Sequence, residues 1–314
     1  MKTKTSKLYP GLPNRYLNIF LALMYTCFVS GSSDAQSYDS LGQLQGHRTK
    51  VFYSKNASDK ANRMAEQLDR VIGFYQEQIR FSPSVVLLVL SPTDWDKYSQ
   101  SMVYGMPHYA DSQTLIVAAE NNDFWKSFIP PLDKLPEEYA SAIRETYKDS
   151  KGGLTMEPFF DLLAIHELGH AYHKQGGLQM QRNWLGELFV NLFLHSYIAE
   201  KEPRLLPALT IFPKMVVAVT NSASLKYTSL QDLETNYAEI AQQYPQNYGW
   251  YQCRWHKEAG GIYDKGGLVI IKKLWSALKN QKEILNDQAL ASLLTDNVHA
   301  SVADVLQQWM PVNN

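Results

Sequence analysis

The sequence predicts an α+β fold in which a small mixed α/β part comes first and a mainly helical part follows. Apolar runs rich in β-branched residues occur mostly in the first third of the chain. After about residue 135 the apolar residues recur at helical spacing or within helix-forming composition. The chain has 314 residues, 45% of them hydrophobic and 19% charged. That composition is typical of a globular protein with a sizeable core.

The first 35 residues have the parts of a secretory signal peptide. A basic start precedes the apolar run YLNIFLALMYTCFVSG, and the small residues Ser33 and Ala35 follow it. We therefore expect residues 1–35 to be cleaved after Ala35 and the protein to be exported to the periplasm or the extracellular space. The alternative is an uncleaved N-terminal segment that anchors the protein in a membrane, although the apolar run is short for a spanning helix.

Charge and cysteine content limit the partners and the sources of stability. The net charge is −1, and cleavage would make it −4 because four basic residues and one acidic residue are lost. Neither value favours a nucleic acid as partner. Cleavage would also leave Cys253 as the single cysteine. An internal disulfide would then be impossible, and the core would have to supply the stability.

The expected elements follow from apolar spacing and from turn residues. Residues 36–48 are polar and predict a loose lead-in to the α/β part at 49–176. In that part a strand, a helix and two further strands are expected at 50–54, 58–81, 83–92 and 111–120. Further helices are expected at 135–148, 158–175, 184–200, 229–242, 262–279 and 298–310. Most of these lie in the helical part at 177–314.

The segment AIHELGHAYHK, residues 164–174, contains the pattern H-E-x-x-H on an expected helix. His166 and His170 are one turn apart, about 6 Å along the axis, so that both imidazoles can point at one zinc ion. Glu167 lies one step round the helix, where it can act as general base on a metal-bound water. The alternative is a pair of core histidines that are satisfied by hydrogen bonds.

His173 shares the face of His166 and His170, but it lies too far along the axis for the same ion. We expect it at the rim of the site or in the core. The metzincin pattern H-E-x-x-H-x-x-G-x-x-H also fails here. His173 stands where that pattern has glycine, and Gly176 stands where it has the third histidine. The third ligand must therefore come from another segment.

Glu187 is the expected third zinc ligand. It belongs to NWLGELFVNLFLHSYIAE, residues 183–200, which is apolar almost all round and therefore predicts a buried helix. Glu187, Asn191 and His195 form one polar stripe along it, and a buried glutamate is rare unless it is paired or binds a metal. An antiparallel return after His170 would bring Glu187 to the histidines, with Asn191 supporting one of them. The alternative for Glu187 is an ion pair with a lysine or arginine.

With these residues the chain resembles the gluzincin metallopeptidases, with Asn191 where that family often has aspartate. GIYDKGGLVIIKKLW, residues 261–275, is similar to a segment of their aminopeptidase branch in which a tyrosine precedes K-G-[AG]. The resemblance implies a thermolysin-like catalytic core, and it implies that Tyr263 donates its hydroxyl to the oxyanion of the reaction. The G-x-M-E-N segment of that branch, which recognises a free amine, is absent.

Residues 103–121 precede the zinc helix and are expected to form an edge strand that pairs with an extended peptide. Glu120 at its end is a weak candidate for binding an amine, and a solvated strand end is the competing interpretation. The expected function is a zinc peptidase with one Zn²⁺ per chain, held by His166, His170 and Glu187, that hydrolyses a peptide or protein substrate. The alternatives are a peptide-binding protein without catalysis on the same scaffold and a zinc hydrolase of cell-wall peptides.

Overall fold

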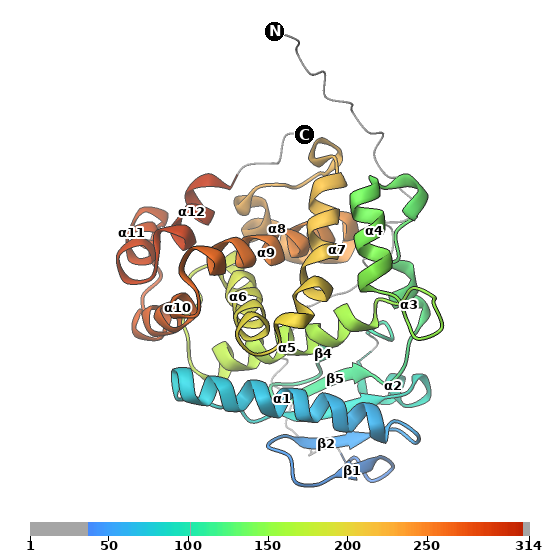
Figure 1. The fold of residues 1–314 in the computed structure, drawn as a ribbon. Coiled ribbons are helices and arrows are strands. Elements are labelled where there is room, and N and C mark those ends of the chain that lie inside the picture. Colours follow the sequence, from blue (N-terminus) through green and yellow to red (C-terminus); the bar gives the residue numbers. More distant parts are fainter. Residues whose placement is uncertain (1–36, 101, 310–314) are drawn as a thin grey trace.

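The computed structural model describes residues 37–100 and 102–309. The expected signal peptide at 1–35 lies outside these residues, so its cleavage stays a prediction. The predicted α+β class is confirmed, because 64% of the residues that the structure describes are helical and five of its strands form a small mixed sheet. Figure 1 shows the sheet at one end of the molecule and the helices from α6 onward at the other, with α5 between them.

The three expected strands and the first helix are present in shortened form, together with two short strands that were not expected, one of them inside the lead-in predicted at 36–48. The strands are β1 (Gly42–Leu44), β2 (Lys50–Tyr53), β3 (Val86–Leu90), β4 (His108–Tyr109) and β5 (Thr114–Ala118). The helices that accompany them are α1 (Ser58–Ile79), α2 (Pro92–Tyr98) and α3 (Asp123–Ser127). Helix α1 connects β2 to the parallel strand β3, which makes a βαβ unit.

The strand order in the sheet is β1-β2-β3-β5-β4. Strands β2, β3 and β5 are mutually parallel, whereas β1 and β4 are antiparallel to their neighbours. All five residues of β5 and four of β3 are buried, as continuous apolar runs in parallel strands predict. The expectation of an edge strand over 103–121 is wrong for β5. Strand β4 covers its outer side and itself has only two residues, both buried.

The remaining helices agree in part with the sequence. They are α4 (Glu137–Thr146), α5 (Glu157–Gln175), α6 (Asn183–Lys201), α7 (Leu206–Val219), α8 (Leu230–Gln243), α9 (Pro245–Gly266), α10 (Val269–Asn280), α11 (Asp287–Asn297) and α12 (Ala300–Gln308). Short 3₁₀ helices occur at Leu132–Lys134, Pro203–Leu205 and Ser222–Ser224. Helices α7, α11 and most of α9 were not expected. Pro213 lies inside α7, and an internal proline argues against a helix in any reading of sequence.

The helix expected over 262–279 is wrong, because the chain breaks in its middle. Helix α9 ends at Gly266, and Gly267 has φ of +62°, in the region that favours glycine. Helix α10 then begins at Val269 in a new direction. The glycine pair is therefore the end of one helix rather than part of a longer one.

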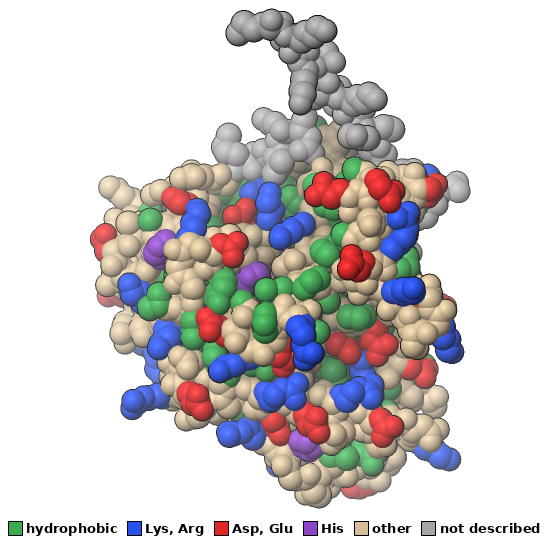
Figure 2. All heavy atoms as spheres, viewed as in Figure 1, with side chains coloured by type: hydrophobic (Ala, Val, Ile, Leu, Met, Phe, Trp, Pro, Cys, Tyr) green, Lys and Arg blue, Asp and Glu red, His purple; other side chains and the backbone are tan. Residues whose placement is uncertain are grey.

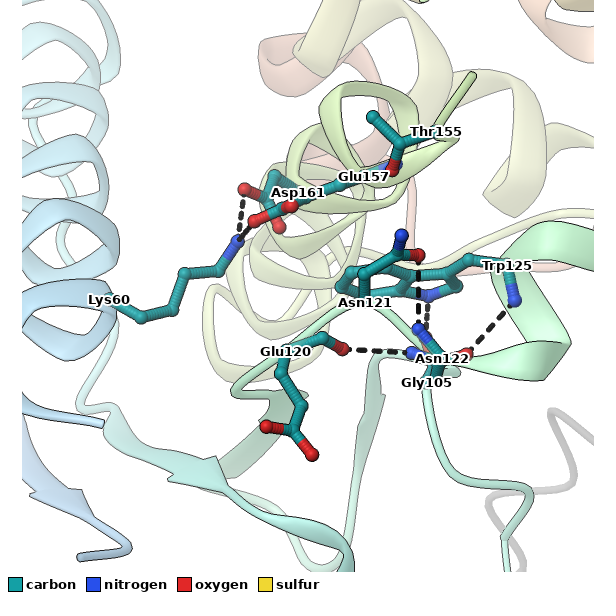
Figure 3. Close-up of polar contacts among 9 residues, drawn as sticks. All are labelled: Lys60, Gly105, Glu120, Asn121, Asn122, Trp125, Thr155, Glu157 and Asp161. Atoms are coloured by element: carbon teal, nitrogen blue, oxygen red, sulfur yellow. Dashed lines mark hydrogen bonds and ion pairs between the residues drawn. The ribbon is translucent and has the colours of Figure 1, made fainter. Parts of the chain in front are cut away.

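Helix α5 is held against the sheet part by a buried ion cluster. The Lys60 ammonium from α1 is 5% exposed, and it donates to Glu157 Oε1 at 2.7 Å and to the Asp161 carboxylate. Figure 3 shows both acidic side chains, from the first turns of α5, converging on Lys60. Carboxylates at the start of a helix also interact favourably with its dipole. This contact fixes the end of α5 that leads into the H-E-x-x-H turn.

Within the described ranges, the structure contains no helix that is both long and apolar enough to cross a membrane. On the face drawn in Figure 2, acidic and basic side chains are interspersed rather than gathered by sign.

Candidate metal centre

Helix α5 brings together the three residues that the H-E-x-x-H pattern singled out. His166, Glu167 and His170 each offer one ligand atom, and these atoms all lie within 4.8 Å of one another. His166 and Glu167 are each 2% exposed. Because the helix is buried on this side, the three polar groups face one another instead of solvent. The cluster is thus an inward-facing one, as the apolar character of α5 predicted.

Helix α6 adds the fourth group. Glu187 Oε2 lies 3.7 Å from His166 Nε2, and Glu187 Oε1 lies 4.0 Å from His170 Nε2. Two atoms that bond to one zinc ion at 2.0–2.2 Å in a tetrahedron are roughly 3.3–3.6 Å apart, so these spacings are close to those of zinc ligands. The structure therefore brings Glu187 to both histidines, as the antiparallel return suggested. Its role as a ligand stays a prediction.

Gly169 allows this approach of α5 to α6. A Cβ atom at Gly169 would lie 3.1 Å from Val190 and 3.3 Å from Phe193, closer than side chains normally pack. The glycine between the two histidines therefore has a packing role, because it sets the distance between the helix that carries the histidines and the helix that carries Glu187.

Two residues that sequence reasoning missed hold the Glu187 carboxylate in place. Tyr237 on α8 donates its hydroxyl to Oε1 at 3.1 Å, and Gln252 on α9 donates to Oε2 at 3.2 Å. Carboxylates that bind metals are usually oriented by such hydrogen bonds. No spacing in the sequence could have identified these two residues, because Tyr237 and Gln252 lie 50 and 65 positions beyond Glu187.

Each histidine of the cluster also has a polar neighbour at its other ring nitrogen. His170 Nδ1 lies 3.0 Å from His173 Nε2, so His173 is a hydrogen-bond partner of the candidate ligand and not merely a rim residue. Asn191 is fully buried, and its Nδ2 donates to the Glu187 backbone carbonyl at 2.9 Å. Its Oδ1 makes no hydrogen bond of standard geometry to a described residue, and neither does His166 Nδ1. The two still interact, because Asn191 opposes the effect of burial on the His166 pKa.

The donor atoms that face the centre of the cluster have no partners. His166 Nε2, His170 Nε2 and Glu167 Oε1 are buried and make no hydrogen bond within the part of the chain that the structure describes. Buried polar atoms are nearly always satisfied, and leaving three together unsatisfied is costly. Two imidazoles and two carboxylates form a donor set that suits a divalent cation such as zinc, whose charge would balance the carboxylates.

The pKa shifts of the cluster also indicate that its charged groups lack compensation inside the fold. Burial lowers the pKa of His166 to about 4 and that of His173 to about 3, and it lowers the pKa of His170 well below its usual value. Burial raises the pKa of Glu167 well above its usual value, and the neighbouring Glu187 raises it further. Burial also raises the pKa of Glu187, against the hydrogen bonds from Gln252 and Tyr237. The imidazoles are therefore held neutral, as metal binding requires.

A cavity of about 340 Å³ opens beside the cluster. Its wall includes Glu167, His170 and Glu187 and also Tyr109 from β4. The Tyr109 hydroxyl is buried and lacks a hydrogen-bond partner among the described residues. Burial, with Glu167 next in effect, raises its pKa well above the usual value, so this hydroxyl keeps its proton near neutral pH. Within the described ranges, this hydroxyl is therefore a hydrogen-bond donor without an acceptor, on a residue that lines the cavity beside the cluster.

The structure does not place Tyr263 in the site. Its hydroxyl donates to Glu200 Oε1 at 2.7 Å, and Glu200 lies 13 residues beyond Glu187 on the same helix. That separation is about 20 Å along the helix axis. The structure therefore does not bring the Tyr263 hydroxyl to the cluster, and the expected role of Tyr263 at the oxyanion has no support in this geometry.

Two other residues from the sequence lie outside the cavity as well. Glu120 is exposed at the end of β5, and Figure 3 shows its carboxylate pointing away from the other labelled side chains. It matches the solvated strand end of the competing interpretation. His195 is buried next to Gly260 and the Tyr263 ring, at the far end of the α6 stripe.

Comparison of the chain with protein-family models and with curated proteins finds no match. An assignment of function must therefore come from the geometry of the cluster itself.

Proposed function

We propose that the protein is an exported, zinc-dependent peptidase of gluzincin type with a thermolysin-like catalytic core. His166, His170 and Glu187 would hold one zinc ion, and Glu167 would act as the general base. The observation that carries this proposal is the convergence of three buried, unpartnered donor atoms on α5 with the oriented carboxylate of Glu187. A core that only had to pack would not bury three such atoms without hydrogen-bond partners beside a fourth ionisable group.

Zinc bound here would polarise a substrate carbonyl and lower the pKa of a coordinated water to about 7. Glu167 supplies the proton transfer. Its Oε1 accepts a proton from the attacking water and later passes it to the amine that leaves. Burial raises the Glu167 pKa, which brings the carboxyl closer to the pH at which a base both accepts and returns a proton.

Tyr109 replaces Tyr263 as the proposed donor to the oxyanion. Tyr109 lines the same cavity as Glu167 and Glu187, and its buried hydroxyl has no competing hydrogen-bond partner among the described residues. A donor that is already oriented and desolvated contributes strongly when negative charge develops on a carbonyl oxygen. Tyr237 and Gln252 have a different task, because they keep the Glu187 carboxylate facing the two histidines.

The experiment that tests this function is cleavage of a peptide library by zinc-loaded protein, with and without a chelator. We expect the chelator to abolish cleavage. We expect Glu167→Gln to lower kcat by at least ~100-fold, since general acid–base catalysis typically contributes that much. The variant should retain its zinc, because the amide removes the base but none of the three proposed ligands.

Glu120→Gln is the matched control, because it makes the same change at an exposed strand end. It should leave both kcat and zinc content unchanged. Unimpaired turnover in Glu167→Gln would refute the base assignment. Binding of peptides without any cleavage, with zinc present, would favour the non-catalytic binding protein instead.

A further inference from the structure

A second cavity, of about 40 Å³, adjoins the metal centre. Its outer wall consists of apolar side chains from the end of α3, from α5, from α7 and from the loop before β4: Met106, Phe128, Phe159, Phe160, Leu163 and Phe212. The rings pack against one another, with 5.1 Å between the centroids of Phe128 and Phe160 and 5.4 Å between those of Phe159 and Phe212. The wall is therefore a mainly aromatic surface in which neighbouring rings are in contact.

The lining of this aromatic cavity also includes polar residues of the metal centre. His166 lines it directly, and so does Gln252, which donates to Glu187 Oε2 at 3.2 Å. The hydroxyl of Tyr248, also in the lining, is buried and makes no hydrogen bond of standard geometry to a described residue, although it interacts with Tyr237 and Gln252. The cluster thus lies between two cavities of different character. The larger one contains charged and amide side chains, whereas the smaller one is aromatic.

We propose that the aromatic cavity accepts the apolar side chain of a substrate residue that flanks the cleaved bond. This inference rests on the proposed function, because it assumes that peptide is cleaved at the neighbouring cluster. A side chain that enters this space loses its water and meets only carbon atoms along most of the wall. A charged or amide side chain would lose its hydrogen bonds without replacement, which excludes it as the preferred occupant.

The size of the cavity sets the preferred side chain. About 10–15 Å³ of such space holds one water molecule, so 40 Å³ has room for roughly three atoms of that size. Three carbons are the side chain of valine. Alanine would leave space unfilled, and phenylalanine would require the aromatic wall to move. In an apolar pocket, one missing methylene changes kcat/KM by about 10- to 200-fold.

The test uses the zinc-loaded full chain and peptides in which the two residues flanking the cleaved bond are varied in turn among alanine, valine, phenylalanine and aspartate. At one of the two positions we expect valine to exceed aspartate and phenylalanine by at least ~10-fold in kcat/KM. Phe212→Ala, which removes a ring from the wall, should shift the preference at that position to phenylalanine. Leu209→Ala truncates another buried side chain of α7 outside the cavity and should keep the preference for valine.

Leu163→Phe provides a second variant in case Phe212→Ala does not fold. Leu163 is only half-buried, and the larger ring would fill the cavity from α5. We expect the variant to lose at least ~10-fold in kcat/KM on the valine peptide and less on the alanine peptide. Leu293→Phe makes the same change at a half-buried position on α11 and should not alter either value.

The outcomes separate this inference from the function on which it rests. Cleavage without preference at either position, or an unchanged preference in both cavity variants, would overturn the inference and leave the peptidase assignment intact. Failure of the zinc-loaded wild type to cleave any peptide would overturn the peptidase assignment and the inference with it.

Discussion

Individual side chains in the cluster differ in how firmly their neighbours fix them. Tyr237 and Gln252 each donate to one oxygen of Glu187, and His173 lies within hydrogen-bonding distance of His170. Glu167, by contrast, has an oxygen that no described group hydrogen-bonds. This difference fits the proposed roles, because a ligand must be held in one orientation. A base must leave an oxygen open for the proton that it accepts.

The two tyrosines give a prediction at this scale. Tyr109→Phe should lower kcat by about 100-fold with little change in KM, because loss of one oxyanion donor acts on the transition state. Tyr263→Phe removes the same hydroxyl at the other end of α6 and should leave kcat and KM as in the wild type. Steady-state kinetics on one good peptide substrate compares the two. Equal effects, or a larger effect at Tyr263, would contradict the site as described.

The residues of the site differ in whether the sequence alone could identify them. His166, Glu167, His170 and Glu187 were identifiable because polar residues at helical spacing stand out in apolar helices. Tyr109 was not, because one buried hydroxyl among 19 tyrosines carries no pattern. Its position depends on the pairing of the two-residue strand β4 with β5, which is a long-range feature of the sheet.

At the scale of the elements, the site depends on how closely α5 approaches α6. Both helices are buried along most of their length, and the predictions of a helix at 158–175 and a buried helix at 184–200 are confirmed within two residues at each end. Their spacing was not predictable from periodicity. The spacing depends on Gly169, which has no side chain at the point where Val190 and Phe193 of α6 pack against α5.

Gly169→Val tests this spacing. The added side chain should push α6 away, lower the free energy of unfolding by about 1–3 kcal/mol and weaken zinc binding, since overpacked cores respond by shifting their helices. Gly261→Val is the control, because a Cβ there meets no atom within 4 Å. Thermal unfolding and zinc titration of both variants provide the measurement. If Gly169→Val binds zinc as tightly as the wild type, helix spacing does not control the site.

For elements without periodicity, sequence reasoning failed for identifiable reasons. Helix α7 was obscured by Pro213, and the break between α9 and α10 was obscured by the apolar pattern that continues across Gly267. In both places the tertiary packing decides the outcome. Helix α7 packs its buried face against α9, and its missing backbone hydrogen bond is tolerated there.

At the scale of the whole molecule, buried titratable groups determine how stability responds to pH. Burial lowers the pKa of six histidines, so each binds a proton less readily in the folded protein than in the unfolded chain: His108, His166, His170, His173, His195 and His256. Burial raises the pKa of three carboxyl groups, at Asp161, Glu167 and Glu187. These groups bind a proton more readily in the folded protein than in the unfolded chain.

The six histidines outnumber the three carboxyl groups. In the metal-free protein they therefore determine whether the free energy of unfolding rises or falls with pH. Between pH 6.5 and 4.5 the unfolded chain binds more protons than the folded one, since unfolded histidines titrate near 6.5. The free energy of unfolding should therefore fall as the pH is lowered through this range. Denaturant unfolding at several pH values, with chelator present, measures it. Stability that is constant or that increases toward pH 4.5 would show that these histidines are not neutral in the fold.

Zinc binding by His166, His170 and Glu187 is tested most simply by measuring the zinc content of the purified protein. Wild-type protein and Glu187→Ala are refolded with zinc, dialysed and analysed for metal, with circular dichroism to show that both are folded. We expect about one zinc ion per wild-type chain and loss or strong weakening of binding in the variant. Folded wild-type protein that stays free of zinc would refute the proposed zinc site. His166 and His170 would then have a purely structural role.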